Sequence, residues 1–557
     1  MIEGRVVELI RSALEAAAPG LGIDGELPEP ELLVPKQKDH GDFSTNVALA
    51  LAKRAGRRPR EVAEAIRAAF AEAPFVERVE IAGPGFLNIF LTNDWLYEAL
   101  REVVDRGAAY GRAAPNGRRM QVEFVSSNPT GPLTIGHARN AAIGDALARL
   151  LEHAGWTVER EYYFNDAGGQ MDRFGASVEA RFLQELGRDA ELPEDGYRGD
   201  YVADIARDIL SAEGAGLADL PDADRLVRLR DEGAARILEG IKSTLERFGV
   251  HFDVYRSERD LAEAGEIDEA IASLRAAGYV YEAEGAMWFR STEFGDDKDR
   301  VVIRSNGVHT YFGADCAYLV DKFSRGFDHV IYVWGADHFG TMARVKGAAE
   351  ALGFDPETVE VLLYQFVAFL RDGEPVKMST RAGEFVTLDE LIDEVGTDAA
   401  RFTLLQYSND SAVNFDIELV KQQTMENPVY YVQYGHARIA SLLRKAGAQG
   451  IPLKPLDDVD LTLLTHEAEI DLLRALADVP GQLMLAAEQR GPYKLTHASQ
   501  NLAARFHRFY TDCRVVSDDE GLTQARLWLC SGTKQVLANL LGILGVSAPE
   551  SMERDDG

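Results

Sequence analysis

Residues 121–164 contain the pattern that most restricts the fold of this chain. A short apolar strand is expected over Gln121-Val-Glu-Phe-Val125, and a second strand over residues 158–164. Between them, a Gly- and Pro-containing loop leads into a helix over about 135–154, with Gly155 as its C-cap. Two strands joined by a helix form a βαβ unit, so this region predicts a parallel sheet covered by helices.

A further strand–loop–helix pattern begins at residue 329, so the α/β region extends beyond this unit. The intervening segment, about 170–285, is mostly helical and acidic, and it predicts an insertion into the sheet domain. The chain ends in long segments with helical apolar spacing. We therefore expect three domains: a small α+β N-terminal domain over 1–112, a Rossmann-like parallel-sheet α/β domain over 113–425 with the insertion, and an all-α domain over 426–557.

The charge of the chain is unevenly distributed. The 557 residues contain 59 Lys and Arg against 91 Asp and Glu, a net charge of −32. Counted from the sequence, residues 1–110 carry −5 and residues 428–557 carry −3, so the middle of the chain carries −24. An acidic total argues against a nucleic-acid partner, because phosphate contacts come from basic surface. The two nearly neutral ends could still bear basic faces.

The cysteines and the apolar segments indicate the compartment. Cys316, Cys513 and Cys530 form no CxxC pair and do not resemble a zinc ribbon, so we expect no zinc and a reducing environment. No apolar run approaches the roughly 18 residues that a membrane helix needs. The first 19 residues predict an amphipathic helix instead of a secretory signal. Together these features predict a cytoplasmic protein with no membrane contact.

The loop at residues 126–140 has the composition of a phosphate-binding site. It lies at the carboxyl end of a predicted strand and opens a helix, which is where open α/β sheets bind ligands. Gly131 and Gly136 allow close backbone approach, and the helix N-terminus offers free N–H groups to an anion. His137 could donate a hydrogen bond to a phosphate. An ordinary loop with a capping histidine is the alternative. No GxxxxGK[ST] motif occurs, which excludes a P-loop NTPase.

A second candidate loop is Lys377-Met-Ser-Thr-Arg-Ala-Gly383. It follows a hairpin-type turn at 371–374, and Thr387 with Glu390 predicts a capping box for the next helix. A lysine on such a loop can stabilise the charge that develops on a leaving pyrophosphate. Taken alone, the pattern is more typical of a solvated basic turn.

Together, the two loops resemble a known pair of motifs. Thr134-Ile-Gly-His137 and Lys377-Met-Ser-Thr380 are similar to the HIGH and KMSK motifs of class I aminoacyl-tRNA synthetases, in the same order. Longer strings resemble the arginyl-tRNA synthetase family: 122–132, 162–168, 427–438, His40-Gly-Asp-Phe43 and Ala548-Pro-Glu550. Two positions depart from the motifs, since Thr134 replaces the first His of HIGH and Thr380 replaces the second Lys of KMSK.

The resemblance implies roles for particular residues. A planar, permanently charged guanidinium is best held by carboxylates, so Glu123 and Asp315 are the expected partners of an arginine side chain. The remaining candidates follow from matching motif positions. Implied catalytic residues are His137 and Lys377; implied ATP-binding residues are Thr134, Gly136, His137, Asn140, Lys377, Met378 and Ser379; implied arginine-binding residues are Glu123, Ser126, Asn128, Tyr311, Asp315 and His338.

The resemblance also implies a reaction and partners. The chain would activate L-arginine with Mg²⁺-ATP and transfer it to the terminal adenosine of tRNA(Arg), and it would act as a monomer. The helical domain would read the anticodon, for which Tyr430, Tyr434 and Arg438 supply aromatic and polar groups. Two alternatives stay open. One is a different HIGH-type enzyme such as a cysteinyl-tRNA synthetase, which the lack of clustered zinc ligands disfavours. The other is a tRNA-binding relative without catalysis.

Overall fold

The computed structural model describes residues 2–35, 37–371, 373–375 and 386–552. The Lys377, Met378, Ser379 and Thr380 motif therefore lies outside the described residues. The chain forms two compact units, and each is described by itself. The first unit comprises residues 1–111, 435–481 and 501–539, and the second comprises residues 112–434, 482–500 and 540–557.

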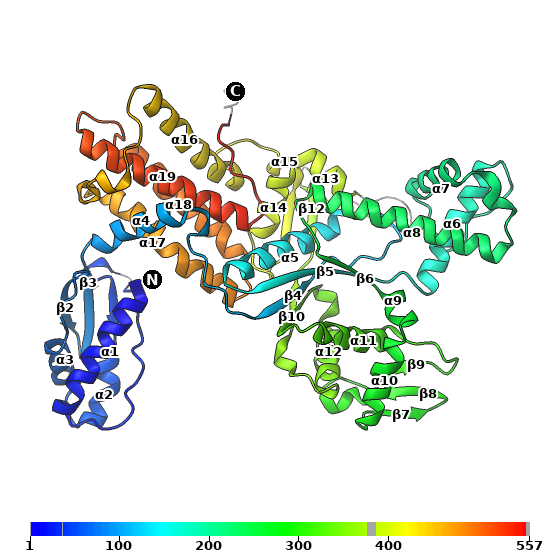
Figure 1. Ribbon diagram of the computed structural model, residues 1–557, viewed down its shortest axis with the longest axis horizontal. Helices are drawn as coiled ribbons and strands as arrows, with labels where there is room; N and C mark the ends of the chain where they lie inside the picture. Colours follow the sequence, from blue (N-terminus) through cyan, green and yellow to red (C-terminus); the bar gives the residue numbers. More distant parts are fainter. Residues whose placement is uncertain (1, 36, 372, 376–385, 553–557) are drawn as a thin grey trace. The chain divides into compact units, whose positions relative to one another are not determined.

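A five-stranded parallel sheet forms the centre of the second unit (Figure 1). The apolar run that predicted the first strand supplies the middle strand, whose side chains are buried on both faces, as is typical of parallel sheets. In spatial order the strands are β11 (Val359–Tyr364), β10 (His329–Gly335), β4 (Arg119–Glu123), β5 (Thr157–Phe164) and β6 (Val254–Ser257).

The helices that connect these strands lie on opposite faces of the sheet. Helix α5 (Ile135–His153) leads from β4 to β5, whereas α12 (Phe339–Ala351) leads from β10 to β11, in the other direction. Because such crossovers are right-handed, the reversal places the two helices on different faces. Helix α11 (Tyr311–Ser324) packs beside α12 (Figure 1). Strand order reverses between β10 and β4, and a ligand crevice is expected at the carboxyl ends there.

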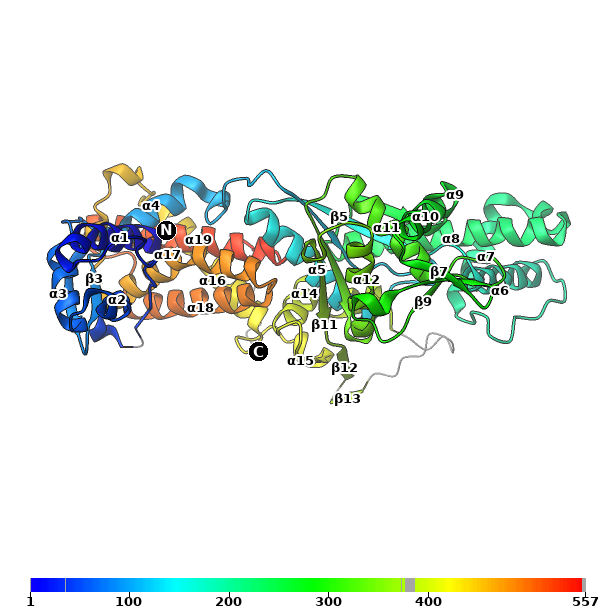
Figure 2. The same ribbon diagram turned by 90° about the horizontal axis from the view of Figure 1, so that it is seen from below.

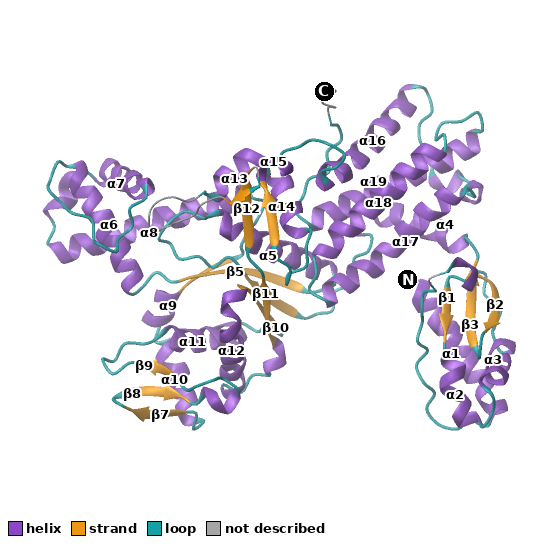
Figure 3. Ribbon diagram, turned by 180° about the vertical axis from the view of Figure 1, so that it is seen from behind, coloured by secondary structure: helices purple, strands orange, loops and turns teal. Residues whose placement is uncertain are grey.

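The segment expected as an insertion contains helices and one strand of the main sheet. Helices α6 (Gly169–Glu185), α7 (Asp200–Glu213) and α8 (Asp222–Arg247) pack on one another, after which the chain re-enters the sheet as β6. A smaller layer follows (Figure 3). It consists of α9 (Glu258–Glu263), α10 (Glu266–Ala276), β7 (Val280–Ala283), β8 (Ala286–Phe289) and β9 (Arg300–Ile303).

After the main sheet, the second unit continues with a small mixed sheet and short helices. Strand β12 pairs in parallel with β14 and in antiparallel with β13. The elements are β12 (Val367–Arg371), β13 (Glu374–Pro375), α13 (Leu388–Val395), α14 (Thr397–Leu405), β14 (Val413–Asp416) and α15 (Ile417–Val420). Thr387 and Glu390 form the predicted capping box of α13.

The N-terminal part of the first unit is an antiparallel sheet with helices packed against it. Asp42, in the His40–Phe43 string, accepts the Leu91 amide hydrogen bond at 2.8 Å and pairs with Arg474. The string therefore has a structural role in this unit. The elements are α1 (Ile2–Leu21), β1 (Phe43–Thr45), α2 (Val47–Ala55), α3 (Pro59–Ala68), β2 (Val76–Ala82), β3 (Phe86–Leu91) and α4 (Asp94–Arg106).

The C-terminal part of the chain is helical, as Figure 2 shows. Its helices are α16 (Pro428–Ala448), α17 (Glu467–Glu488), α18 (Tyr493–Asp512) and α19 (Glu520–Ile543). Each of them contributes residues to both compact units. The parallel sheet, the N-terminal α+β region and the helical C-terminal region confirm the expected fold class. Within the described ranges, no helix has the length and apolarity to cross a membrane.

Candidate active site

The loop that follows β4 begins with an unusual backbone turn. Val125 and Ser126 have φ values of 65° and 46°, in the left-handed region that non-glycine residues rarely adopt. Asn140 holds this turn: its Oδ1 accepts the Val125 N–H at 2.7 Å, and its Nδ2 donates to the Val333 carbonyl at 2.9 Å. The buried amide of Asn140 thus fixes the ends of β4 and β10 at a strained position, as is common at functional sites.

The N-terminus of α5 places a neutral histidine beside a cavity. Thr134 is the N-cap residue, and its backbone N–H donates to His137 Nδ1 at 3.1 Å. Burial lowers the pKa of His137, so the ring is neutral near pH 7, and with Nδ1 accepting, the proton is on Nε2. The cavity measures about 650 Å³. Its lining includes Ser127, Asn128, Gly131, Thr134 and His137 from the loop, and Gln170, Arg173, Tyr197 and Tyr201 from the insertion.

The flanks of the two sequence motifs are joined through their backbones. Ile135 N–H donates to the Val386 carbonyl at 3.1 Å, and Leu388 N–H donates to the Leu133 carbonyl at 2.9 Å. Thr134 forms a bridge with Thr387 between these two bonds. Residues 386–388 are therefore anchored to the start of α5.

Three carboxyl groups converge near the carboxyl edge of the sheet. Glu123 ends β4 and is 4% exposed, Asp315 lies on the second turn of α11, and Glu258 is the first residue of α9. Burial, followed by the charges of Glu258 and Glu123, raises the pKa of Asp315 to about 7, with Arg344 opposing this shift. Burial also raises the pKa of Glu258. Such an acidic pocket favours a cationic ligand.

The two oxygens of Glu123 have different partners. Ser126 Oγ donates to Glu123 Oε1 at 3.0 Å, which orients the carboxylate. Glu123 Oε2 is buried and lies at ion-pair distance, 3.1 Å, from Lys322 Nζ, but it accepts no well-aligned hydrogen bond within the described structure. A guanidinium N–H could complete its hydrogen bonding.

Sequence reasoning missed Glu258. Its carboxylate accepts from Tyr163 Oη and from Asn165 Nδ2, each at 2.9 Å, so it faces the end of β5. The residue directly follows β6, which lies inside the segment expected as an insertion. The four-residue strand before it, Val254-Tyr-Arg-Ser257, was the available signal, because parallel strands bring their carboxyl ends to one edge.

The other arginine-binding candidates differ in their solvent exposure and in their partners. Asn128 is engaged with α6 and with the end of β5: its Nδ2 donates to Gln170 Oε1 at 2.8 Å, and its Oδ1 accepts the Asn165 N–H at 3.1 Å. Tyr311 begins α11, one turn before Asp315, and is 60% exposed. His338, beyond the end of β10, is also exposed, and its ring lies 5.6 Å from that of Trp334.

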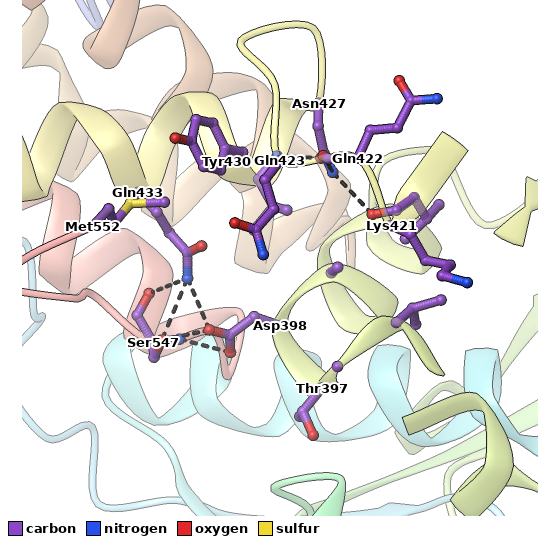
Figure 4. Close-up of a pocket in the computed structure, with 15 residues that line it drawn as sticks. Thr397, Asp398, Lys421, Gln422, Gln423, Asn427, Tyr430, Gln433, Ser547 and Met552 are labelled. Atoms are coloured by element: carbon purple, nitrogen blue, oxygen red, sulfur yellow. Dashed lines mark hydrogen bonds between the residues drawn. The ribbon is translucent and has the colours of Figure 1, made fainter. Parts of the chain in front are cut away.

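The tRNA-binding candidates lie on α16. Tyr430 is 8% exposed, its ring is stacked on that of Tyr434 with centroids 6.1 Å apart, and it lines a cavity of about 600 Å³ in the second unit. Figure 4 shows this cavity, where Gln433 Nε2 donates to Asp398 Oδ2 and to the Ser547 carbonyl. In the first unit, the Arg438 guanidinium lies over the Tyr510 ring at 4.2 Å.

Comparisons with known proteins give the same assignment along the whole chain. Residues 5–91 match the arginyl tRNA synthetase N terminal domain. Residues 99–441 match the catalytic domain of class I (R) tRNA synthetases, and residues 432–552 match the DALR anticodon binding domain. The chain belongs to the arginyl-tRNA synthetase family. The expected resemblance is thereby confirmed.

Individual members of the family support this placement. The arginine–tRNA ligase of Desulforamulus reducens is 47% identical over 98% of this chain and 100% of its own length. That of Frankia alni is 52% identical over 93% of this chain and 94% of its own. The Thermus thermophilus arginyl-tRNA synthetase structure has a TM-score of 0.73 at 25% identity, covering 99% of this chain and 100% of its own.

Proposed function

We propose that this member of the arginyl-tRNA synthetase family ligates arginine to tRNA(Arg) with ATP, and that Glu123, Asp315 and Glu258 bind the arginine side chain. The observation that carries the assignment of the pocket is the convergence of these three carboxyl groups at the edge of the sheet where α5 begins. A guanidinium would satisfy the buried Glu123 Oε2 and restore the charge of Asp315. Ser126 orients Glu123, whereas Asn128 and Tyr311 would contact the rest of the amino acid.

The same edge of the sheet supports the activation step. The arginine carboxylate attacks the α-phosphorus of ATP, a carboxyl-phosphate bond forms, and the bond to pyrophosphate breaks. His137 would donate through Nε2–H to a phosphate, and Gly136 lets the helix N-terminus approach it. Lys377, Met378 and Ser379 would cover the phosphates. Mg²⁺ would accompany ATP as part of the substrate. Asn140 would act as a positioning residue, because its amide already holds the strand ends.

The second step transfers the arginyl group to tRNA. The 2′-hydroxyl of the terminal adenosine attacks the arginyl carbonyl, an ester forms, and AMP leaves. The α16 residues Tyr430, Tyr434 and Arg438 would contribute to anticodon binding, with single-stranded bases stacking on aromatic rings. We further propose that the chain acts in the cytoplasm, as a monomer without zinc.

Aminoacylation of a tRNA mixture, tested separately with each of the twenty amino acids, examines this function. We expect arginine alone to be attached, since a site with buried carboxylates should reject neutral and smaller side chains strongly. Attachment of a different amino acid would contradict the proposal. Binding of tRNA without attachment of any amino acid would favour a non-catalytic member of the family.

A further inference from the structure

A buried lysine lies directly behind the arginine pocket. Lys322 is on α11, two turns after Asp315, and is 1% exposed. Its Nζ donates to Gln121 Oε1 and lies 3.1 Å from Glu123 Oε2 and 3.4 Å from Glu161 Oε1. It also lies 4.0 Å from the ring centroid of Tyr318. An ammonium this deeply buried is tolerated only when its charge is compensated.

The two carboxylates beside Lys322 differ in their other partners. Glu161 also accepts hydrogen bonds from Arg325 Nη1 and Nη2, at 2.5 and 3.1 Å, and from the hydroxyl of Tyr318. Glu123 receives only the Ser126 hydroxyl as an additional donor within the described residues. Lys322 is therefore the one described cation within ion-pair distance of Glu123. Glu161 would keep a cation if the lysine were removed, but Glu123 would not.

The contact between Lys322 and Glu123 leaves the carboxylate usable. The two groups are 3.1 Å apart, yet Glu123 Oε2 accepts no hydrogen bond from the described residues. Gln121 and Glu161 take two of the three ammonium donors. Lys322 thus compensates the charge of Glu123, and the carboxylate keeps lone pairs with which a guanidinium could pair.

We propose that Lys322 is a positioning residue of the arginine pocket, which pairs with Glu123 and holds its carboxylate in place for the substrate guanidinium. This inference rests on the proposed function of Glu123. It gives the lysine a role in selecting arginine beyond attaching α11 to the sheet. Lys322 itself does not touch the substrate.

The test is Lys322→Met, measured by aminoacylation kinetics with arginine and ATP varied in turn. We expect the KM for arginine to rise roughly 10- to 100-fold, less than for the loss of a charge that touches the guanidinium itself. The KM for ATP should change less than about twofold. An unchanged arginine KM, or equal rises in both KM values, would overturn the proposal.

A second variant separates positioning from stability. Lys322→Met combined with Glu161→Gln removes one charge of each sign, so thermal stability should recover relative to the single variant. We expect its arginine KM to remain raised, because Glu123 still lacks a cation. Recovery of both properties together would show that Lys322 serves only the fold. If the single variant does not fold, the arginine KM of the double variant by itself tests the proposal.

Two controls complete the design. Arg401→Met removes another buried cation of the same unit, one that pairs with Asp145, and should lower stability without changing the KM for arginine. Glu123→Gln tests the pocket itself. If Glu123→Gln leaves the arginine KM unchanged, the proposed pocket is wrong. If Glu123→Gln raises it but Lys322→Met does not, only the inference about Lys322 fails.

Discussion

Single residues at this site have properties that their neighbours set. Asp315 has a raised pKa because it is buried beside two other carboxyl groups, and His137 is neutral because it is buried and accepts the Thr134 amide through Nδ1. The first group is suited to receive a cation, and the second to donate a hydrogen bond to an anion. Both properties can be tested by substitution and by pH.

Asp315→Asn should reduce arginine use while it stabilises the empty protein. Loss of a carboxylate that meets a buried guanidinium costs about 3–5 kcal/mol, or roughly two to four decades in kcat/KM for arginine. Because the folded-state pKa is raised, ionised Asp315 lowers stability above the unfolded-state pKa, and this cost is complete above about pH 7. The melting temperature of the variant should exceed that of the wild type at pH 8 but not at pH 4. Wild-type aminoacylation would instead leave Glu123 and Glu258 as the guanidinium partners.

Arginine binding should also depend on pH through Asp315. Its carboxyl group is protonated below a pKa of about 7, so the KM for arginine should rise as the pH falls from 8 to 6. The KM for ATP should change less over this range, because burial lowers the pKa of His137 and so disfavours protonation of the ring. Steady-state kinetics with each substrate varied in turn measures both. ATP use that improves toward pH 6 would indicate that a charged His137 binds phosphate.

A few hydrogen bonds connect the secondary-structure elements at the site. The turn after β4 depends on Asn140 of α5, and the start of α5 depends on backbone bonds to residues 386 and 388. These contacts hold the first motif and residues 386–388 at one edge of the sheet. A substitution that removes one of these hydrogen bonds should therefore reduce the use of both arginine and ATP.

Asn140→Ala would leave the Val125 N–H and the Val333 carbonyl without their partner. We expect a loss of about 1–3 kcal/mol of unfolding free energy, the cost of buried polar groups left unsatisfied. Since the turn also positions Glu123 and the ATP loop, kcat/KM should fall for arginine and for ATP together. Urea unfolding and aminoacylation kinetics on the same preparation test this. A fall confined to ATP would point to direct contact between Asn140 and the nucleotide.

At the scale of the whole molecule, the compact units do not follow the order of the sequence. Residues 482–500 and 540–557 belong to the same unit as the parallel sheet. Within it, Arg401 donates to the Leu544 carbonyl, and Arg490 pairs with Glu360 at 3.0 Å. A cut before residue 428 would remove parts of the catalytic unit together with the C-terminal helices. Point variants are thus better probes of tRNA binding than truncation.

Activation should require tRNA. Thr380 replaces the second lysine of the KMSK pattern, so the loop has one cation fewer with which to hold pyrophosphate. We expect arginine-dependent exchange of pyrophosphate into ATP only when tRNA(Arg) is present. Exchange of labelled pyrophosphate with and without tRNA is the measurement. Rapid exchange without RNA would contradict this expectation.

Binding of tRNA should weaken as salt rises, in spite of the net charge of −32. Filter binding of wild type and Tyr434→Ala at several salt concentrations tests the role of α16. We expect the variant to bind tRNA about 10-fold less tightly or weaker at each salt concentration, since a stacked base contributes roughly 1–3 kcal/mol. Its KM for arginine should be unchanged. Equal tRNA affinity of the variant and the wild type would show that Tyr434 does not contact tRNA and has only a structural role.

The sequence by itself determined the fold class, the family and most of the candidate residues. These follow from local patterns: a βαβ periodicity, a Gly-containing loop before a helix, and motif strings that need no knowledge of distant contacts. Glu123 and His137 were accessible because each lies within a few residues of such a pattern.

Only the tertiary structure decided which of these groups lie together. Glu258 lies near Glu123 and Asp315 because β6 returns to the sheet beside β5 after α6, α7 and α8, and local spacing is no guide to a partner so distant in sequence. Lys322 reaches Glu123 from a different element, which no periodicity along the chain indicates.

The physical reason is that charge and burial belong to the folded environment. The pKa of Asp315 depends on its burial and on Glu258 and Glu123, which lie at the ends of two different strands. The tautomer of His137 depends on a backbone amide that only the helix cap directs toward it. A sequence specifies which groups are present, but their protonation and their partners are set by the distances that folding creates.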